Sequence, residues 1–306
     1  MLSANKFHFL DGKELTPETL NNLLTLAETL KTERDNGIQR NELKGKTLAL
    51  LFDKPSLRTR MSFSLAMSEL GGSIIEAPAN LRKHEEPQDL AGVISRYVHG
   101  IMIRTHAHEG LERFISRSKV PVLNGLTDEH HPCQALADIL TLKQAFGSTE
   151  GLKLTYIGDG NNVLHSLMVL APMAGIHVQY ATPANYRPDG KLLEWCQQRK
   201  GAAGSVTAFQ TPAEAVKDTN AIYTDVWTSM GFESENEERL KAFQGYQVNA
   251  GLYAQAAHKA IVMHCMPMVR EQEITSEMAD HDRSFIYQQA ENRLHVQKAL
   301  LWELLR

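Results

Sequence analysis

The sequence has few cysteines, no excess of basic charge and no long apolar run. Only Cys133, Cys196 and Cys265 occur in 306 residues, which favours thiols in a reducing compartment over a disulfide framework. The formal net charge of −4 excludes the broad basic surface that nucleic acids or anionic membranes require. No apolar run approaches the roughly 20 residues that span a bilayer, and residues 1–15 lack the pattern of a signal peptide. We therefore expect a cytoplasmic globular protein with no membrane or nucleic-acid partner.

The remaining sequence alternates between strand patterns and helical periods. This alternation predicts βαβ units in mostly parallel sheets. No Pro/Ser-rich linker interrupts it, and a restart near residue 147 divides the chain. The fold class we predict is α/β, with two doubly wound parallel-sheet domains at residues 1–147 and 148–306. The expected strands are 47–52, 73–76, 101–104, 120–124, 153–157, 177–181, 205–208, 221–224, 260–264 and 284–287.

Several helices have distinct start or stop signals. Thr16 can cap a helix whose first residue is Pro17, and leucines at helical spacing follow it. A long helix is expected from Pro132 to Phe146, before a glycine. The last segment, 291–305, also has helical periodicity.

Polar motifs follow the predicted strands of the first domain. Residues 56–60, Ser-Leu-Arg-Thr-Arg, open a helix, where backbone N–H groups, hydroxyls and guanidinium groups form an anion site. The alternative is a capped helix with solvated arginines. Arg104 ends the strand 101–104, a position that favours contact with an anion or a carbonyl oxygen; the alternative is a surface salt bridge. His130 and His131 have no further ligand at metal-binding spacing, which argues against a metal site. The motif alone favours a structural histidine, and the alternative is a neutral imidazole that donates to a carbonyl group.

Three further motifs follow strands of the second domain. Gly-Asp-Gly-Asn-Asn at 158–162 has two of the glycines of a dinucleotide fingerprint, but position 163 is Val. A tight turn that presents Asn162 is therefore favoured over a nicotinamide site. The segments 225–231 and 264–267 alone indicate loop packing. Together with the first-domain motifs, they predict one crevice at the carboxyl ends of parallel strands.

The order and spacing of these motifs resemble the aspartate/ornithine carbamoyltransferase family, its ornithine-type members in particular, over essentially the whole chain. The resemblance implies a carbamoyl-phosphate domain and an amino-acid domain, with a final helix at about 290–306 that packs back on the first. It also implies a homotrimer with active sites shared between subunits. The motifs are Ser-x-Arg-Thr-Arg at 56–60, His-Pro-x-Gln at 131–134, Gly-Asp-Gly-Asn-Asn at 158–162, Asp-x-Trp-x-Ser-Met-Gly at 225–231, His-Cys-x-Pro at 264–267 and Glu-Asn-Arg at 291–293.

The same resemblance implies transfer of the carbamoyl group from carbamoyl phosphate to the δ-amine of L-ornithine, giving L-citrulline and phosphate. No metal or organic cofactor is implied, because the leaving phosphate can accept the amine proton. The implied catalytic residues are Arg104, His131, Asp225 and Cys265. The implied carbamoyl-phosphate ligands are Ser56, Leu57, Arg58, Thr59, Asn80, Arg104, His131, Gln134, Cys265, Met266 and Arg293. The implied ornithine ligands are Asn162, Asp225, Ser229 and Met230.

Three positions depart from the family pattern. Leu57 replaces the common threonine, Met266 replaces leucine, and Asn80 begins a segment, 80–84, shorter than the family's inter-subunit loop. The alternatives are transfer to a related amine or an acylated ornithine, a catalytically silent carbamoyl-phosphate-binding paralogue, and a nicotinamide-dependent dehydrogenase. The intact Ser-Met-Gly at 229–231 favours free ornithine.

Overall fold

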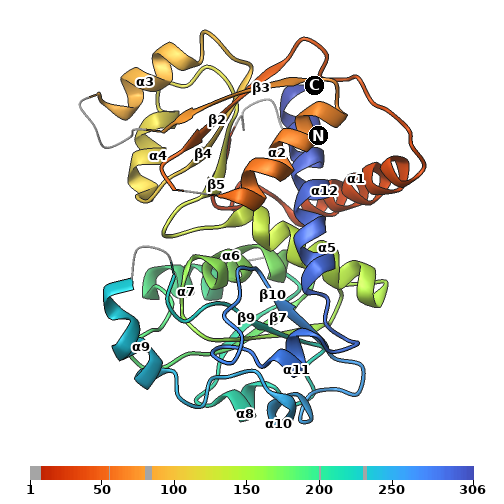
Figure 1. The fold of residues 1–306 in the computed structure, drawn as a ribbon, viewed down its shortest axis with the longest axis vertical. Helices are drawn as coiled ribbons and strands as arrows, with labels where there is room; N and C mark the ends of the chain where they lie inside the picture. Colours follow the sequence, from red (N-terminus) through yellow and green to blue (C-terminus); the bar gives the residue numbers. More distant parts are fainter. Residues whose placement is uncertain (1–7, 55, 80–84, 200, 230–232) are drawn as a thin grey trace. The chain divides into compact units, whose positions relative to one another are not determined.

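The computed structural model describes residues 8–54, 56–79, 85–199, 201–229 and 233–306. The chain forms two compact units (Figure 1). Unit 1 comprises residues Met1–Ala137 and Asn292–Arg306, and unit 2 comprises Asp138–Glu291. Both divisions fall inside helices, whereas the expected division was after residue 147. Each unit is built on its own five-stranded sheet.

The sheet of unit 1 has the strand order β1-β5-β4-β2-β3, and all its pairings are parallel. The chain winds outward from β2 in both directions, which is the doubly wound arrangement. The strands are β1 (His8–Phe9), β2 (Thr47–Phe52), β3 (Ser73–Pro78), β4 (Gly100–Arg104) and β5 (Val122–Leu126). The helices are α1 (Pro17–Asp35), α2 (Leu57–Glu69), α3 (Pro87–Ile94) and α4 (His108–Ile115), with the start of α5 (Pro132–Phe146) and most of α12 (Ile286–Leu305).

The sheet of unit 2 has the order β10-β9-β6-β7-β8 and is also parallel throughout. Its order reverses at β6. The strands are β6 (Lys153–Ile157), β7 (His177–Ala181), β8 (Val206–Ala208), β9 (Ala221–Thr224) and β10 (Ile261–His264). The helical segments are α6 (Asn162–Leu170), η1 (Ala171–Ala174), α7 (Gly190–Gln198), α8 (Pro212–Ala215), η2 (Glu233–Glu235), α9 (Asn236–Ala242), α10 (Ala250–Tyr253) and α11 (Ser276–Ala279).

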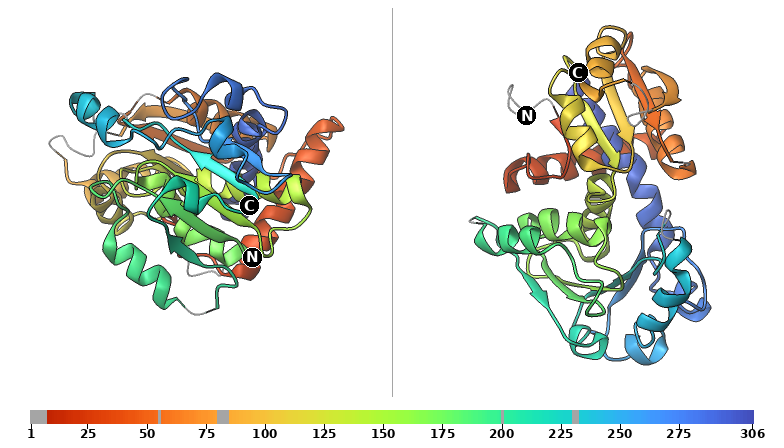
Figure 2. Two further views of the ribbon diagram at one scale, coloured as in Figure 1. Left: turned by 90° about the horizontal axis from the view of Figure 1, so that it is seen from below. Right: turned by 90° about the vertical axis from the view of Figure 1, so that its left-hand side faces the viewer.

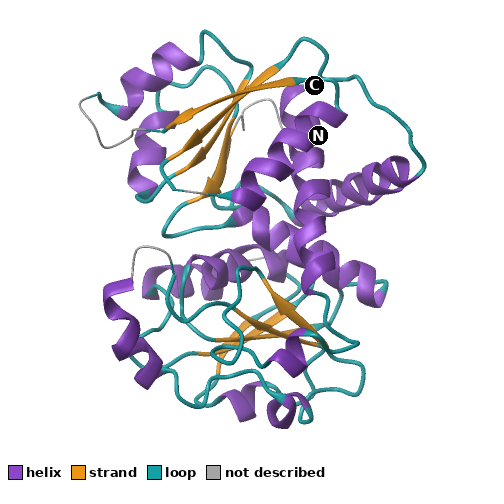
Figure 3. Cartoon of the chain, viewed as in Figure 1, coloured by secondary structure: helices purple, strands orange, loops and turns teal. Residues whose placement is uncertain are grey.

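Local sequence signals account for much of this architecture. Thr16 caps α1, its hydroxyl accepting from the Thr19 backbone, and Pro17 is the first helical residue. The leucine face of α1 is buried as expected. Helices cover both faces of each sheet (Figures 2 and 3), so the central strands are buried on both sides and read as continuous apolar runs. The predicted α/β class with two doubly wound sheets is confirmed.

Two details of the strand prediction were wrong. The expected strand at 284–287 does not form: Ser284 makes only an isolated bridge with Val262, and α12 begins at Ile286. Ile286 is buried in the unit 2 core, where helical packing outweighs its strand propensity. The short strand β1 was not predicted, because two residues carry no periodicity.

In the part of the chain that the structure describes, no helix combines the length and apolar character needed to cross a membrane.

Candidate active site

The motif residues of unit 1 gather at the carboxyl edge of its sheet. Phe52 of β2 pairs with Arg104 of β4, and Arg104 pairs with Leu126 of β5. Because β2 and β4 lie where the strand order reverses, the loops that follow them diverge and leave a binding position between them. The motif at 56–60 follows β2 at this position.

The N-terminus of α2 presents unsatisfied donors. Ser56 is the N-cap residue, but its side chain makes no capping hydrogen bond to the helix. Its hydroxyl and the first-turn N–H groups are therefore available to an anion, which the helix dipole also favours. The Leu57 side chain is 67% exposed. Leucine at this position removes a hydroxyl from the motif but keeps the backbone N–H.

Thr59 connects two arginines from distant parts of the sequence. The buried Thr59 Oγ1 accepts from Arg293 Nη2 at 2.7 Å and from Arg104 Nη1 at 3.2 Å. Arg104 is only 8% exposed, and the Arg104 Nε atom has no hydrogen-bond partner among the described residues. A threonine hydroxyl orients both guanidinium groups without neutralising either.

The electrostatics of unit 1 favour an anionic ligand. Burial, then repulsion from Arg293 and Arg58, lowers the pKa of Arg104 to about 10. Burial and the positive charges of Arg293, Arg104 and Arg58 also lower the pKa of His131 well below its usual value. His131 is therefore a neutral imidazole at physiological pH, and the three arginines form a cationic site that an anion would neutralise.

The start of α5 contributes two buried polar residues to the same unit. Its N-terminal turn follows His131, whose carbonyl oxygen accepts from Gln134 N at 3.0 Å. His131 and Gln134 are both buried. Cys133 lies between them, but burial raises its pKa to about 12 and its thiol donates to Asn124 O at 3.5 Å. Cys133 therefore packs as a structural residue.

Strand register brings three motifs of unit 2 together. Ile157 of β6 pairs with Thr224 of β9, and Thr224 pairs with His264 of β10. The residues that follow, Gly158, Asp225 and Cys265, consequently lie on neighbouring strand ends at the point where this sheet reverses its order. The second-domain motifs predicted from sequence thus converge within unit 2.

Asp225 is the central carboxylate of this group. It is 6% exposed, and its Oδ1 accepts from Val226 N at 2.8 Å. Its Oδ2 accepts from Asn161 Nδ2 at 2.8 Å. Asn161 in turn caps α6 by accepting from Val163 N at 3.0 Å and Leu164 N at 3.3 Å. A buried carboxylate held this rigidly is suited to recognising a cationic group.

The same Asn161 cap argues against a dinucleotide site. In dinucleotide-binding folds the pyrophosphate takes the N–H groups at this helix N-terminus. Here the Asn161 side chain already accepts from these N–H groups. The occupied helix N-terminus and the valine at position 163, where the dinucleotide fingerprint has its third glycine, therefore both argue against a nicotinamide site.

Asp225, His264 and Cys265 place one ligand atom each within 4.8 Å of one another. The His264 Nδ1 accepts from Met266 N at 2.9 Å, and its Nε2 bonds Glu273 Oε1 at 3.0 Å. Nδ1 therefore has its lone pair occupied and Nε2 carries the proton, so the imidazole has no lone pair left for a metal. The proximity of these three side chains therefore does not make a metal site.

Comparison with known proteins agrees with this geometry. The model for the carbamoyl-P binding domain of aspartate/ornithine carbamoyltransferases matches residues 7–144, and that for their Asp/Orn binding domain matches 150–304. The chain belongs to this family. The ornithine carbamoyltransferase of Methanocorpusculum labreanum is 45% identical over 303 residues, covering 98% of each chain.

A second relative and a solved structure extend the comparison. The ornithine carbamoyltransferase of Pyrococcus horikoshii is 45% identical over 297 residues, covering 96% of this chain and 94% of the relative. The structure of ornithine carbamoyltransferase from Pyrococcus furiosus has a TM-score of 0.94 at 43% identity, covering 98% of this chain and 97% of that one. The likeness to the carbamoyltransferase family thus spans both units.

Not every residue implied by the family resemblance can be located. Asn80 and Met230 lie outside the described residues. Asn162 is the first residue of α6, and Ser229 is half-buried in the loop after β9. Met266 has a φ of +60° and precedes a cis peptide bond to Pro267.

Sequence reasoning missed two residues that organise this carbamoyltransferase site. Asn162 was predicted as a ligand, but Asn161 was not assigned a role. Asn161 is the residue directly before a helix, and an asparagine there is a recognisable capping signal. Arg239 of α9 donates to Asp159 Oδ2 at 2.8 Å and to Trp227 O at 3.0 Å, which joins the loops after β6 and β9. Burial raises the pKa of Asp159, while Arg239 opposes this rise. No local pattern around Arg239 indicated this role.

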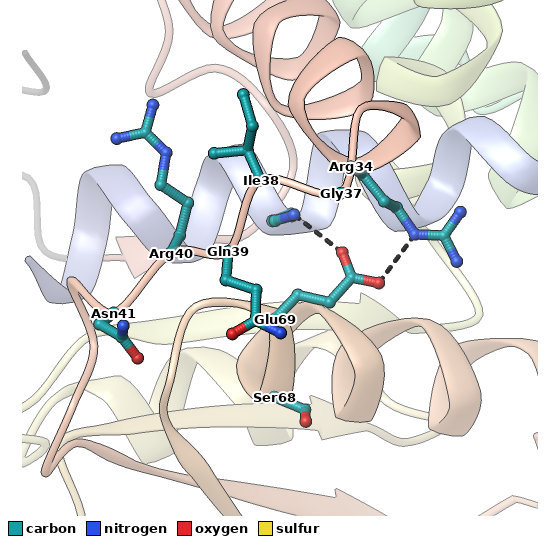
Figure 4. A pocket seen from close by; sticks show the side chains of 9 residues that line it. Arg34, Gly37, Ile38, Gln39, Arg40, Asn41, Ser68 and Glu69 are labelled. Atoms are coloured by element: carbon teal, nitrogen blue, oxygen red, sulfur yellow. Dashed lines mark hydrogen bonds and ion pairs between the residues drawn. The ribbon is translucent and has the colours of Figure 1, made fainter.

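A polar pocket of about 380 Å³ in unit 1 lies apart from the family motifs (Figure 4). Its Glu69 carboxylate accepts from Arg34 Nε at 2.8 Å and from the buried Lys298 Nζ at 2.8 Å. These contacts tie α12 to α1 and α2. The ion pair between Glu69 and Lys298 therefore holds α12, the helix that supplies Arg293, against α2.

The Cys265 thiol is expected to react slowly with alkylating reagents. It is buried, and burial together with the nearby Asp225 raises its pKa well above the usual value, so the reactive thiolate is scarce at neutral pH. Cys196, which is partly exposed on α7, provides the internal control. Mass mapping after iodoacetamide treatment of the native protein should find Cys196 modified well before Cys265. Equal rates would contradict this protonated, shielded state.

Proposed function

We propose that the protein transfers the carbamoyl group of carbamoyl phosphate to the δ-amine of L-ornithine. The observation that carries the proposal is the group of Thr59, Arg104 and Arg293 beside the N-terminus of α2, because it concentrates positive charge where a phosphate fits. The buried Asp225 supplies the complementary site for an amine in unit 2. The relatives named above are ornithine carbamoyltransferases and support this substrate pair.

Unit 1 would hold and polarise carbamoyl phosphate. Ser56, the first N–H groups of α2, including that of Leu57, and Arg58 would bind the phosphate. Arg104 and the neutral His131 would donate to the carbamoyl oxygen as negative charge develops on it. The remaining contacts that we propose for this ligand are those of Thr59, Asn80, Gln134, Cys265, Met266 and Arg293.

Unit 2 would hold ornithine. Asp225 and Cys265 would orient the δ-amine, while Asn162, Ser229 and Met230 would bind the α-amino and α-carboxylate groups. The amine forms the new N–C bond, the C–O bond to phosphate breaks, and the leaving phosphate takes the amine proton. These steps balance without a metal or an organic cofactor.

The deciding experiment is citrulline formation from carbamoyl phosphate by the purified chain. L-Ornithine is compared with putrescine, aspartate, N-acetylornithine and N-succinylornithine, and we expect ornithine to have by far the highest kcat/KM. Preference for an acylated ornithine would reassign the substrate. Binding of carbamoyl phosphate without transfer to any amine would indicate a silent paralogue.

We further propose a cytoplasmic homotrimer whose active sites are shared between subunits. An apolar stripe along α2 supports an interface between copies: Leu57, Met61 and Leu65 recur at helical spacing and are 67%, 53% and 42% exposed. The segment 80–84, for which we expect the inter-subunit contact, lies outside the described residues.

Mixing two inactive variants tests the shared site. One variant carries Arg58→Lys, and the other changes Arg82 and Lys83 to alanine. Random reassembly should restore part of the activity, because some sites then receive both wild-type contributions. Mixed trimers that remain inactive, with both parents inactive and folded, would show that each subunit builds its site alone.

A further inference from the structure

Glu273 is a fully buried carboxylate outside all six motifs, in the segment before α11. Its Oε1 accepts from His264 Nε2 at 3.0 Å and from Val269 N at 2.6 Å. A carboxylate is costly to bury, and these two donors satisfy only one of its oxygens. The Oε2 atom is buried with no hydrogen-bond partner among the described residues. Burial of this kind calls for a role beyond packing.

The Glu273 contact sets the tautomer of His264. Because Met266 N donates to His264 Nδ1 at 2.9 Å, Nδ1 carries no proton, and the ring proton lies on Nε2, facing Glu273. The bond from Met266 back to His264 spans two residues and closes a tight turn around Cys265. Met266 has a φ of +60°, which is unfavourable for a side chain of this size and needs such support.

The main chain of His264 is anchored as well. Its N–H donates to Gln289 Oε1 at 2.8 Å, and Gln289 Nε2 donates to Asp138 Oδ1 at 2.7 Å. Gln289 and Asp138 are fully buried. Because the backbone of His264 is fixed in this way, the position of its ring proton, on Nδ1 or on Nε2, decides how the side chain bonds to its neighbours.

We propose that Glu273 is a positioning residue for carbamoyl transfer. By accepting the Nε2 proton of His264, it keeps Nδ1 as an acceptor for Met266 N–H, and this turn holds the Cys265 thiol beside Asp225. Glu273 acts on Cys265 through His264, while its second contact, from Val269 N, fixes the carboxylate in place. The inference rests on the proposed function, since it concerns the turn that supplies Cys265 to the same site.

Four variants separate this role from simple packing. Glu273→Leu removes the acceptor, and we expect kcat to fall about 100-fold, the cost of a small misplacement at a reacting centre. Glu273→Gln keeps a carbonyl oxygen for both donors and should retain most of the activity. His264→Asn places an Oδ1 acceptor two residues before Met266, as in an Asx-turn. The double variant His264→Asn/Glu273→Leu should therefore be more active than Glu273→Leu alone.

Imidazole ¹⁵N chemical shifts of the full-length protein read the tautomer independently of catalysis. The His264 signal is assigned among the 13 histidines by its loss in His264→Asn. We expect the Nε2–H form in the wild type and in Glu273→Gln, and a shift toward the Nδ1–H form in Glu273→Leu. An unchanged tautomer in Glu273→Leu, a Glu273→Gln variant as inactive as Glu273→Leu, or a double variant that shows no rescue would each overturn the proposal. If the wild type forms no citrulline, the proposed function fails. The tautomer measurement then still tests whether Glu273 sets the ring proton of His264.

Discussion

Replacing Arg104 with methionine is expected to remove most carbamoyl transfer while leaving the protein at least as stable as the wild type. Loss of one donor to a developing oxyanion costs about 10²–10³-fold in kcat. The stability should not fall, because burial and the charges of Arg293 and Arg58 lower the pKa of Arg104. A lowered pKa in a base means that folding disfavours its charged form at all pH values below that pKa. An apolar side chain relieves this repulsion.

Steady-state kinetics and the thermal midpoint together test this prediction. Arg117→Met is the matched control, since Arg117 is exposed in unit 1 and pairs with Asp89 at 2.8 Å. The control should have nearly wild-type kinetics. An unchanged kcat and KM for carbamoyl phosphate in Arg104→Met would exclude Arg104 from the site, and a clearly lower midpoint would show that its charge stabilises the fold.

Asp225→Asn should abolish efficient use of ornithine without weakening carbamoyl-phosphate binding. Truncating one partner of a buried, hydrogen-bonded charge pair costs about 2–5 kcal/mol, so kcat/KM for ornithine should fall by roughly 30- to 4,000-fold. The substitution also leaves one acceptor oxygen for two donors, Val226 N and Asn161 Nδ2. A modest loss of stability is therefore expected as well.

Calorimetric titration with each substrate separates recognition from folding. Asp218→Asn is the control, because Asp218 is exposed in unit 2 and its φ of +55° is one that asparagine tolerates. Equal weakening of both ligands in Asp225→Asn would mean that the substitution acts through the fold, and the assignment to ornithine would then be wrong.

Both sheets were predictable because their signals are local. The run at 47–52 forms β2 with the expected bounds, and Thr16 and Pro17 start α1 where expected. The position of the motif loops was predictable for a related reason, because the loops that follow parallel strands all lie at the carboxyl edge of the sheet. The run at 284–287 misled the prediction because β-branched and aromatic residues begin α12.

The supporting contacts were not predictable, because they join residues far apart in the chain. Asn161 reaches Asp225 across 64 positions, and Arg239 reaches Asp159 across 80. Neither pair has a spacing that periodicity or capping rules describe. Glu273 lies only nine positions from His264, yet nothing in the intervening sequence indicates that both are buried together.

The discontinuity of unit 1 has a consequence for biosynthesis. Arg293, whose guanidinium group contacts Thr59, belongs to the segment Asn292–Arg306, which the ribosome makes after residues 138–291. At 5–20 residues per second, those 154 residues (291 − 138 + 1) delay completion of unit 1 by roughly 8–30 s. Unit 2 is continuous and can fold first. The growing chain therefore exposes an unfinished first domain throughout this interval, and carbamoyl-phosphate affinity should appear only with the last helix.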